Sequence, residues 1–535
     1  MPIAKISSRP ITLRSSIRAA IFVGLIASVT LTGCSVGPKY RPPQMPEPHF
    51  DAALSTSPTS AATQPSSQPT TRPVDLTRWW TSLDDPELNS LVERAVKANY
   101  NLRIAGARLQ EVRAVEQAVG GGIVPGLGET TGVEVSAGAG RGSGTNSARG
   151  RVAGPLHAGT NTTGLKEITH VAGFDASWEL DLFGRFGSEL QAADADVQAA
   201  AEFCNDVLLS VVAEVVRTYV DVRSLQLRLE IARENLAAQK RTADLVTIRF
   251  NRGLTNELDV TLAERQYQTT LSQIAPLQAA IAAAQRRAAV LVGQYPETLR
   301  GELERPSPLP ATPPMVAPGM PVEMLRRRPD IRQAERQLAA STARVGIATA
   351  DLFPRVALTG GAGVQGQGLG RSPVMNAITW SIGPTLYWPF LDFGRLDALV
   401  QAQDFRSQQR LLEYQRAVVS AVEEVDDALS NYAAQQDHLQ QLSVAVSVSR
   451  KAERIATQRY NNGLTDFLNV LDAQRQLYDL EDQYALAQAS LTREFIALYK
   501  ALGGGWEGYE APAPPKPPLP ALLAAGARTI GAQRP

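Results

Sequence analysis

Apolar residues recur at intervals of three and four over two long segments of this chain, residues 187–250 and 396–460. This spacing predicts two α-helices, and neither segment contains a proline. At a rise of 1.5 Å per residue, each helix would be roughly 95–100 Å long. Helices of that length are typical of coiled coils and helical barrels rather than of a single globular core.

Shorter helical patterns accompany the two long ones. Residues 255–293 and 465–502 follow the long segments directly and are expected to lead back alongside them. Two further patterns, residues 85–119 and 322–351, each lead through a proline into a predicted strand. One return pattern and one pattern that leads into a strand are together about as long as one long helix. This match predicts two continuous and two interrupted helical columns per chain.

One turn occurs twice in the sequence, with a separation of 210 residues. The copies extend without a gap over residues 249–266 and 459–476, and ten of the eighteen aligned pairs are identical. In each copy a glycine can adopt the left-handed conformation that ends a helix, and a threonine two residues later can cap the next helix. These tip residues are Gly253, Thr255, Gly463 and Thr465. We interpret the two helical tips as the functional end of the molecule.

Two stretches alternate between apolar and polar residues, as strands do. They are residues 171–180 and 382–390, and Trp178 and Trp388 fall at equivalent places near their ends. Strands of about ten residues with one apolar face suit a membrane β-barrel, although a soluble β-hairpin would alternate in the same way. Weaker partner strands are expected at about 131–140 and 355–366.

The number of strands has a consequence for assembly. Four strands cannot close a barrel, because small membrane barrels need about eight. An open sheet edge in lipid would leave backbone groups without hydrogen bonds. The chain is therefore expected to form oligomers through its strands, and three copies would give twelve strands and twelve helical columns in one continuous tube.

The N-terminal residues have the features of a lipoprotein signal. Four basic residues precede a mostly apolar run at residues 19–33, which is too short to span a bilayer comfortably. The run ends in Leu31-Thr32-Gly33-Cys34, which resembles a bacterial lipobox. Acylation of Cys34 would anchor the mature chain to a membrane. The alternative is an ordinary signal peptide with a chance cysteine.

These patterns divide the chain into six segments. We expect a signal peptide at 1–33, a lipidated cysteine with a Ser/Thr/Pro-rich tether at 34–78, a first repeat at 79–300, a Pro-rich connection at 301–321, a second repeat at 322–503 and a Pro/Ala-rich tail at 504–535. The β-hairpins are placed at about 130–182 and 355–391, and the tips at about 251–256 and 461–466.

Composition argues against several classes of function. The 53 basic residues balance the 53 acidic ones, so no nucleic-acid partner is indicated. The two cysteines form no disulfide framework, and the four histidines lack the spacing of a metal site. Residues 361–366 fit a dinucleotide-binding fingerprint but do not open a helix, so we interpret them as a glycine-rich strand. Cys204 is interpreted as a core residue, and the acids of 423–427 as a solvated or pore-facing surface. We expect neither an enzyme nor a cofactor, apart from covalent lipid on Cys34.

Several short motifs occur together over residues 34–503. They are Cys34-Ser35-Val36-Gly37-Pro38-Lys39-Tyr40-Arg41-Pro42-Pro43, Trp79-Trp80 with Asp85-Pro86-Glu87-Leu88, Arg327-Arg328-Pro329-Asp330-Ile331 with Ala334-Glu335, Leu391-Asp392-Phe393-Gly394-Arg395, and the tip from Tyr460 to Arg475. In this combination the chain resembles outer-membrane factors of the TolC/OprM-like family, in particular the NodT-type lipoproteins of resistance-nodulation-division efflux systems.

The resemblance implies a mostly helical TolC-like fold with two tandem helix–β-hairpin–helix repeats. It implies a homotrimer whose 12-stranded β-barrel is continued by a long α-helical periplasmic barrel. The chain would lie in the outer membrane of a Gram-negative bacterium, anchored by lipid, with a large periplasmic part. Its partners would be outer-membrane lipid, a periplasmic adaptor protein and an inner-membrane transporter of the resistance-nodulation-division type.

The resemblance also implies a gate at the tips. Leu468, Asp472 and Arg475 match the constricting and gate-pairing positions of the family, and Tyr460 and Asp259 match its tip-locking contacts. Thr465 and Asn469 stand where some relatives carry a basic residue and a second aspartate, so one charged ring is expected to be weaker here.

The spacing of the gate residues is compatible with that role. Leu468, Asp472 and Arg475 lie at i, i+4 and i+7 on one helical face, so three copies would form an apolar ring and an acidic ring around a central axis. The alternative is a surface ion pair between Asp472 and Arg475, worth only about 0.3–0.5 kcal/mol.

The function expected is that of a passive exit duct for small molecules in a tripartite efflux pump. Two alternatives remain open: a TolC-like duct for type I protein secretion, and a non-conducting periplasmic lipoprotein that spaces two membranes.

Overall fold

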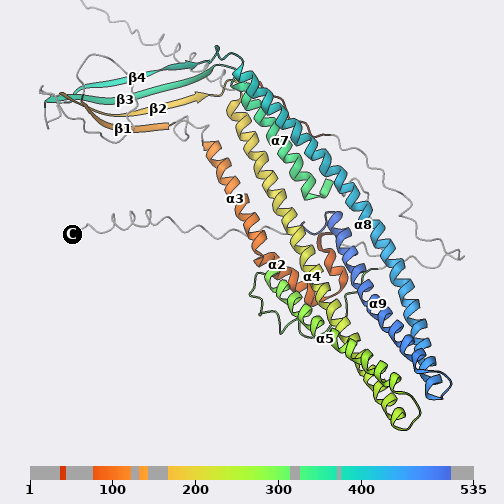
Figure 1. Ribbon diagram of the computed structural model, residues 1–535. Coiled ribbons are helices and arrows are strands. Elements are labelled where there is room, and N and C mark those ends of the chain that lie inside the picture. Colours follow the sequence, from red (N-terminus) through yellow and green to blue (C-terminus); the bar gives the residue numbers. More distant parts are fainter. Residues whose placement is uncertain are drawn as a thin grey trace, which may run out of the picture. The chain divides into compact units, whose positions relative to one another are not determined.

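The computed structural model describes residues 36–43, 76–121, 132–141, 167–313, 326–369 and 375–507. The predicted signal peptide, Cys34 and the C-terminal tail from residue 508 lie outside the described residues, as does most of the tether. In chain order the elements are η2 (Leu76–Leu83), α2 (Pro86–Ala98), α3 (Tyr100–Gly121), β1 (Gly132–Arg141), β2 (Glu167–Leu180), α4 (Arg185–Asn251), α5 (Glu257–Leu291), α7 (Pro329–Ala350), β3 (Arg355–Leu369), β4 (Met375–Tyr387), α8 (Arg395–Asn461) and α9 (Phe467–Ala501) (Figure 1).

The helices show the tandem organisation expected from the repeated turn. The outgoing helices α4 and α8 have 67 residues each, and the return helices α5 and α9 have 35 each. Each outgoing helix is joined to its return helix by one short turn (Figure 1). No described helix combines the length and the apolar character that a membrane-spanning helix requires.

Contacts between residues divide the chain into two compact units, each assembled from three stretches. The first unit combines residues up to Pro43 with Glu111–Ala199 and Glu335–Glu413. The second combines Gln44–Gln110, Ala200–Ala334 and the chain from Tyr414 onward. The sheet belongs to the first unit, and both helical tips belong to the second.

The first unit contains a four-stranded antiparallel sheet in the order β1-β2-β3-β4 (Figure 1). The central pair joins the two repeats, because Trp178 of β2 lies opposite Leu358 of β3. The strand β4 differs at both ends from the alternating stretch 382–390 that the sequence predicted. It begins earlier, at Met375, and ends earlier, at Tyr387, so Trp388 lies beyond it. There the Trp388 indole donates a hydrogen bond of 3.1 Å to the Leu352 carbonyl, just before β3.

The segment after the predicted lipidation site packs closely against the first unit. The N–H of Val36 donates a hydrogen bond of 3.4 Å to the carbonyl of Phe183, just beyond β2. Gly37 crosses Gly346 of α7 so closely that a Cβ on Gly37 would lie 2.5 Å from the Gly346 Cα. Since real side chains do not approach that closely, this crossing requires glycine.

The largest hydrophobic core lies in the second unit. There Trp79 is fully buried, and its ring stacks on Tyr499 of α9 at 5.6 Å between centroids. Arg223 of α4 is also fully buried and donates hydrogen bonds to the Glu87 carboxylate at 2.5 Å and the Arg305 carbonyl at 2.7 Å. Buried charges need such partners. The bond to Glu87 connects α2 to α4, and the bond to Arg305 connects the segment after α5 to α4.

The helix expected over residues 85–119 is interrupted, which corrects the sequence prediction. It divides at Asn99, whose backbone has φ −59° and ψ 130°. The Asn99 side-chain oxygen accepts hydrogen bonds from the N–H groups of Asn101 and Leu102. The side-chain amide of Asn99 donates a hydrogen bond of 2.7 Å to the Leu291 carbonyl. Apolar periodicity continues through the break, so the pattern alone did not indicate it.

Candidate functional site: a gate at the helical tips

The two tip turns have the same backbone geometry. Gly253 has φ +69° and Gly463 has φ +72°, so both adopt the predicted left-handed conformation. The next residue in each turn, Leu254 or Leu464, donates a backbone hydrogen bond of 2.9 Å back to the arginine carbonyl five residues earlier. This is the hydrogen-bond pattern of a Schellman motif, which ends a helix and reverses the chain.

The caps of the return helices differ from the prediction. The residues in N-cap position are Asn256 and Asp466, each one position after the predicted threonine. The Asn256 side chain accepts from the Asp259 N–H at 2.9 Å, whereas Asp466 makes no such bond. The threonines bond side chains instead: Thr255 donates its hydroxyl proton to Asp259, and Thr465 accepts from the amide of Asn469.

A small apolar core joins the two tips. It consists of Val246, Ala263, Tyr460, Phe467, Val470 and Leu471, and so contains residues of both repeats. At its edge the Arg249 guanidinium lies 4.5 Å from the centre of the Tyr460 ring and donates a hydrogen bond of 2.9 Å to the Tyr460 carbonyl. The two tips are thus joined by this shared core and, at its edge, by Arg249.

The two residues predicted to lock the tip do not meet within the described chain. The Asp259 carboxylate is engaged by Thr255 on its own turn. The Tyr460 hydroxyl is buried and has no hydrogen-bond partner among the described residues. The Tyr460 ring packs against Phe467 at 5.5 Å between centroids. Within one chain Tyr460 therefore acts through packing, and a locking role for its hydroxyl would need another chain.

The predicted gate residues lie on the exposed side of α9. The Leu468 side chain is 55% exposed, although most large apolar side chains of this helix are buried. Asp472 accepts a hydrogen bond of 3.2 Å from the amide of Gln476. Among the described residues, no ion pair joins Asp472 to Arg475, so the surface pair that competed with the gate interpretation is not formed in this structure.

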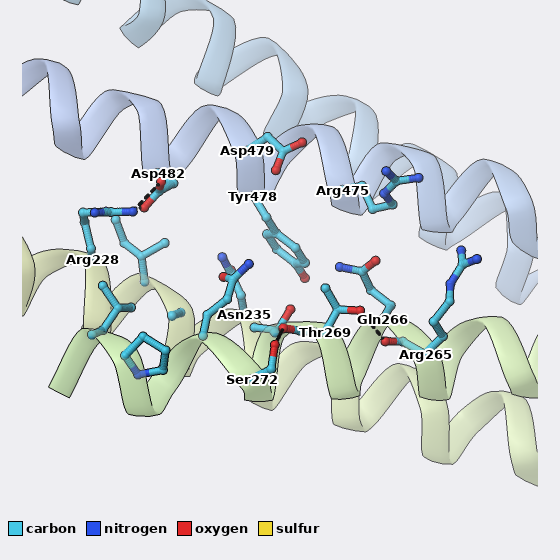
Figure 2. Close-up of a pocket in the computed structure, with 16 residues that line it drawn as sticks. Arg228, Asn235, Arg265, Gln266, Thr269, Ser272, Arg475, Tyr478, Asp479 and Asp482 are labelled. Atoms are coloured by element: carbon cyan, nitrogen blue, oxygen red, sulfur yellow. Dashed lines mark hydrogen bonds and ion pairs between the residues drawn. The ribbon is translucent and has the colours of Figure 1, made fainter. Parts of the chain in front are cut away.

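Arg475 instead borders an open cavity of about 730 Å³ between α4, α5 and α9 (Figure 2). Arg265 borders the same cavity from α5. The sequence predicts no role for Arg265 by itself. The signal was available in the repeat, however, because Arg265 and Arg475 occupy equivalent positions 210 residues apart.

Three signals that the sequence analysis set aside lie in structural positions. Cys204 is buried in the main core, and burial raises the pKa of its thiol. The glycine-rich residues 361–366 lie within β3 rather than at a helix start. Glu424 accepts a hydrogen bond of 2.7 Å from Arg328. Among the described residues, no group of histidine, cysteine or acidic side chains is arranged to hold a metal ion.

The profile described as "Outer membrane efflux protein" matches residues 91–294 and 320–504. Nodulation protein T of Rhizobium leguminosarum bv. trifolii is 31% identical over 480 residues, covering 90% of this chain and 96% of the relative. The toluene efflux pump outer membrane protein TtgF of Pseudomonas putida is 28% identical, covering 91% and 97%.

Solved structures of outer-membrane channels are also similar to this chain. The outer-membrane channel OprN is similar with a TM-score of 0.77 and 37% identity, covering 88% of this chain and all of that one. The CusC structure is similar with a TM-score of 0.73 and 25% identity, again over 88% of this chain and all of the other. The structure therefore has the TolC-like fold that the sequence predicted, and this chain belongs to the outer membrane efflux protein family.

Proposed function

We propose that this chain forms the outer-membrane exit duct of a tripartite efflux pump and conducts small molecules passively. The observation that carries the proposal is the match to the outer membrane efflux protein family over most of the chain, together with a fold shared with outer-membrane channels. Relatives named as efflux pump components support the same role.

The sheet supports assembly into a homotrimer. Within the described chain, β1 and β4 are the outer strands and each pairs on one side alone. The free backbone groups on these edges need partners if the sheet lies in lipid. Pairing β4 of one protomer with β1 of the next would satisfy them. A trimer is the assembly we propose, with an adaptor and an inner-membrane transporter of the resistance-nodulation-division type as the further partners.

The N-terminal segment supports a lipid anchor on Cys34. Val36, two residues after this cysteine, is bonded to Phe183 at the end of β2. Two residues of extended chain reach at most about 7 Å, so Cys34 would be held near that end of the sheet. Acyl chains placed there would enter the same membrane as the strands.

The test is to purify the full-length protein from membranes, measure its mass in detergent, and reconstitute it in planar bilayers. We expect a trimer that conducts ions, and restored efflux when the gene is returned to a strain lacking it. A stable monomer would contradict the duct. A trimer without conductance under any condition would favour the periplasmic spacer, and restored protein secretion without restored efflux would favour type I secretion.

A further inference from the structure

The cavity between α4, α5 and α9 has a distinct arrangement of charge along its length. At one end Arg228 and Asp482 form a bidentate ion pair of 2.7 and 3.1 Å, so their charges cancel (Figure 2). At the other end lie Arg265 of α5 and Arg475 of α9. The two arginines come from return helices of different repeats, and each is the ninth residue of its helix.

Neither of these two arginines is held in a close ion pair among the described residues, although Asp472 and Asp479 lie three residues before and four residues after Arg475 on α9. No ion pair within 4 Å involves Arg265 or Arg475 in the described part of the chain. Arg265 has no acidic residue three or four positions away on α5, where a helical partner would lie. Asp479 is the remaining acid in the lining, so with the Arg228–Asp482 pair cancelled the cavity carries a net charge of +1.

The rest of the lining provides both hydrogen-bond donors and apolar surface. Gln266 and Asn235 contribute amide groups. Tyr478 points from α9 toward α5 in the middle of the cavity, where its ring can cover a flat ligand (Figure 2). Additional apolar surface comes from Ile231, Ala232, Pro276 and Leu277. A volume of about 730 Å³ lies within the range of small-molecule sites, about 300–1,000 Å³.

We propose that this cavity binds a small organic carboxylate with an aromatic or other apolar body. The guanidinium groups of Arg265 and Arg475 would hold the carboxylate, since their fork of N–H donors fits two carboxylate oxygens. The apolar body would lie along Tyr478 and Leu277. Such a ligand would join α5 to α9 and thereby hold the two repeats together about two helical turns or more from the tip turns. Binding of this kind does not depend on the proposed efflux function.

The test uses the full-length protein in a non-ionic detergent, titrated with benzoate and followed by calorimetry. Benzamide serves as the neutral probe of the same shape, and sulfate as the anion without an apolar body. We expect saturable binding of benzoate at one site per chain, with benzamide and sulfate each binding at least about tenfold more weakly.

Three variants make the test specific to this cavity. Arg265→Gln should weaken benzoate binding by about tenfold or more, because one charge-assisted contact is lost. Asp479→Asn should strengthen it several-fold, because the remaining acid is removed. Arg286→Gln removes an exposed arginine of the same helix that does not line the cavity, and should leave binding unchanged. Helical circular dichroism would confirm that all three variants are folded.

Several results would overturn the proposal. These are the absence of saturable benzoate binding, equal binding of benzamide or sulfate, unchanged binding in Arg265→Gln, and equal losses in Arg265→Gln and Arg286→Gln. None of them would bear on the duct itself, whose conductance is measured without added carboxylate.

Discussion

The guanidinium of Arg249 lies 4.5 Å from the centre of the Tyr460 ring, and its Nη1 donates a hydrogen bond of 2.9 Å to the Tyr460 carbonyl. The two residues belong to different repeats. The equivalent pair by sequence, Arg459 with Phe250, makes no such contact in the described structure. The repeat is therefore broken at the tip, where one arginine of the duplicated turn attaches the two hairpins and its counterpart remains exposed.

Replacing Arg249 should loosen this attachment. A hydrogen bond from a charged donor is worth about 1.5–3 kcal/mol, and Arg249→Ala removes it together with the contact to the ring. We expect hydrogen exchange of the amides in residues 459–470 to accelerate by about tenfold or more. Arg459→Ala is the matched control, since it changes the equivalent arginine without breaking this contact. Equal acceleration in both variants would refute the role of Arg249.

Tyr460 should tolerate loss of its hydroxyl but not of its ring. The hydroxyl is buried without a partner among the described residues, so Tyr460→Phe is expected to leave stability unchanged or raise it by about 1 kcal/mol. Tyr460→Ala leaves a cavity in the tip core and should cost about 3–5 kcal/mol. Urea unfolding of the tip followed by hydrogen exchange measures both. A higher resting conductance in Tyr460→Phe would instead show that the hydroxyl bonds to another protomer.

Asp472 and Arg475 are predicted to close the resting channel. If three copies surround one axis, removal of either charge should weaken the closed tip and raise resting conductance in planar bilayers. Asp472→Ala and Arg475→Ala should both show this increase. Asp437→Ala removes an exposed acid of α8 away from the tip and serves as the control. Unchanged conductance in both gate variants would remove these residues from the gate.

Asp206 predicts a pH dependence of stability. Burial, with a smaller contribution from Asp330, raises the pKa of Asp206 above its ordinary value of 3.8, against the opposing charges of Lys500 and Arg328. The folded protein therefore holds this proton more tightly than the unfolded chain, and the stability that the protonated group contributes is lost as the pH rises through the raised pKa.

The variant Asp206→Asn removes this penalty without removing the side chain. It should melt at a higher temperature than the original protein at about pH 7, and the difference should shrink as the pH falls below the ordinary value of 3.8 to about pH 3, where the original carboxyl is protonated in both states. Thermal melts of both proteins across this range provide the measurement. A difference that grows as the pH falls would contradict the raised pKa.

The amino-acid sequence determined the elements and their order. The 210-residue repeat predicted two long helices, two return helices and the glycines that close the turns, because helical periodicity and left-handed glycines are local properties of the chain. It also indicated Cys204 as a core residue. Local signals were less accurate where two neighbouring residues compete, as at Thr255 and Asn256 for the cap position.

Tertiary structure alone decided which residues meet. Arg249 and Arg459 occupy equivalent positions of the repeat, yet of the two, in the described part of the chain, only Arg249 lies against an aromatic ring of the other repeat. Arg265 and Arg475 border one cavity because α5 and α9 pack on either side of it, which no spacing within one helix could show. Periodicity fixes the face of a helix on which a side chain lies, but the element opposite that face depends on packing between segments far apart in the chain.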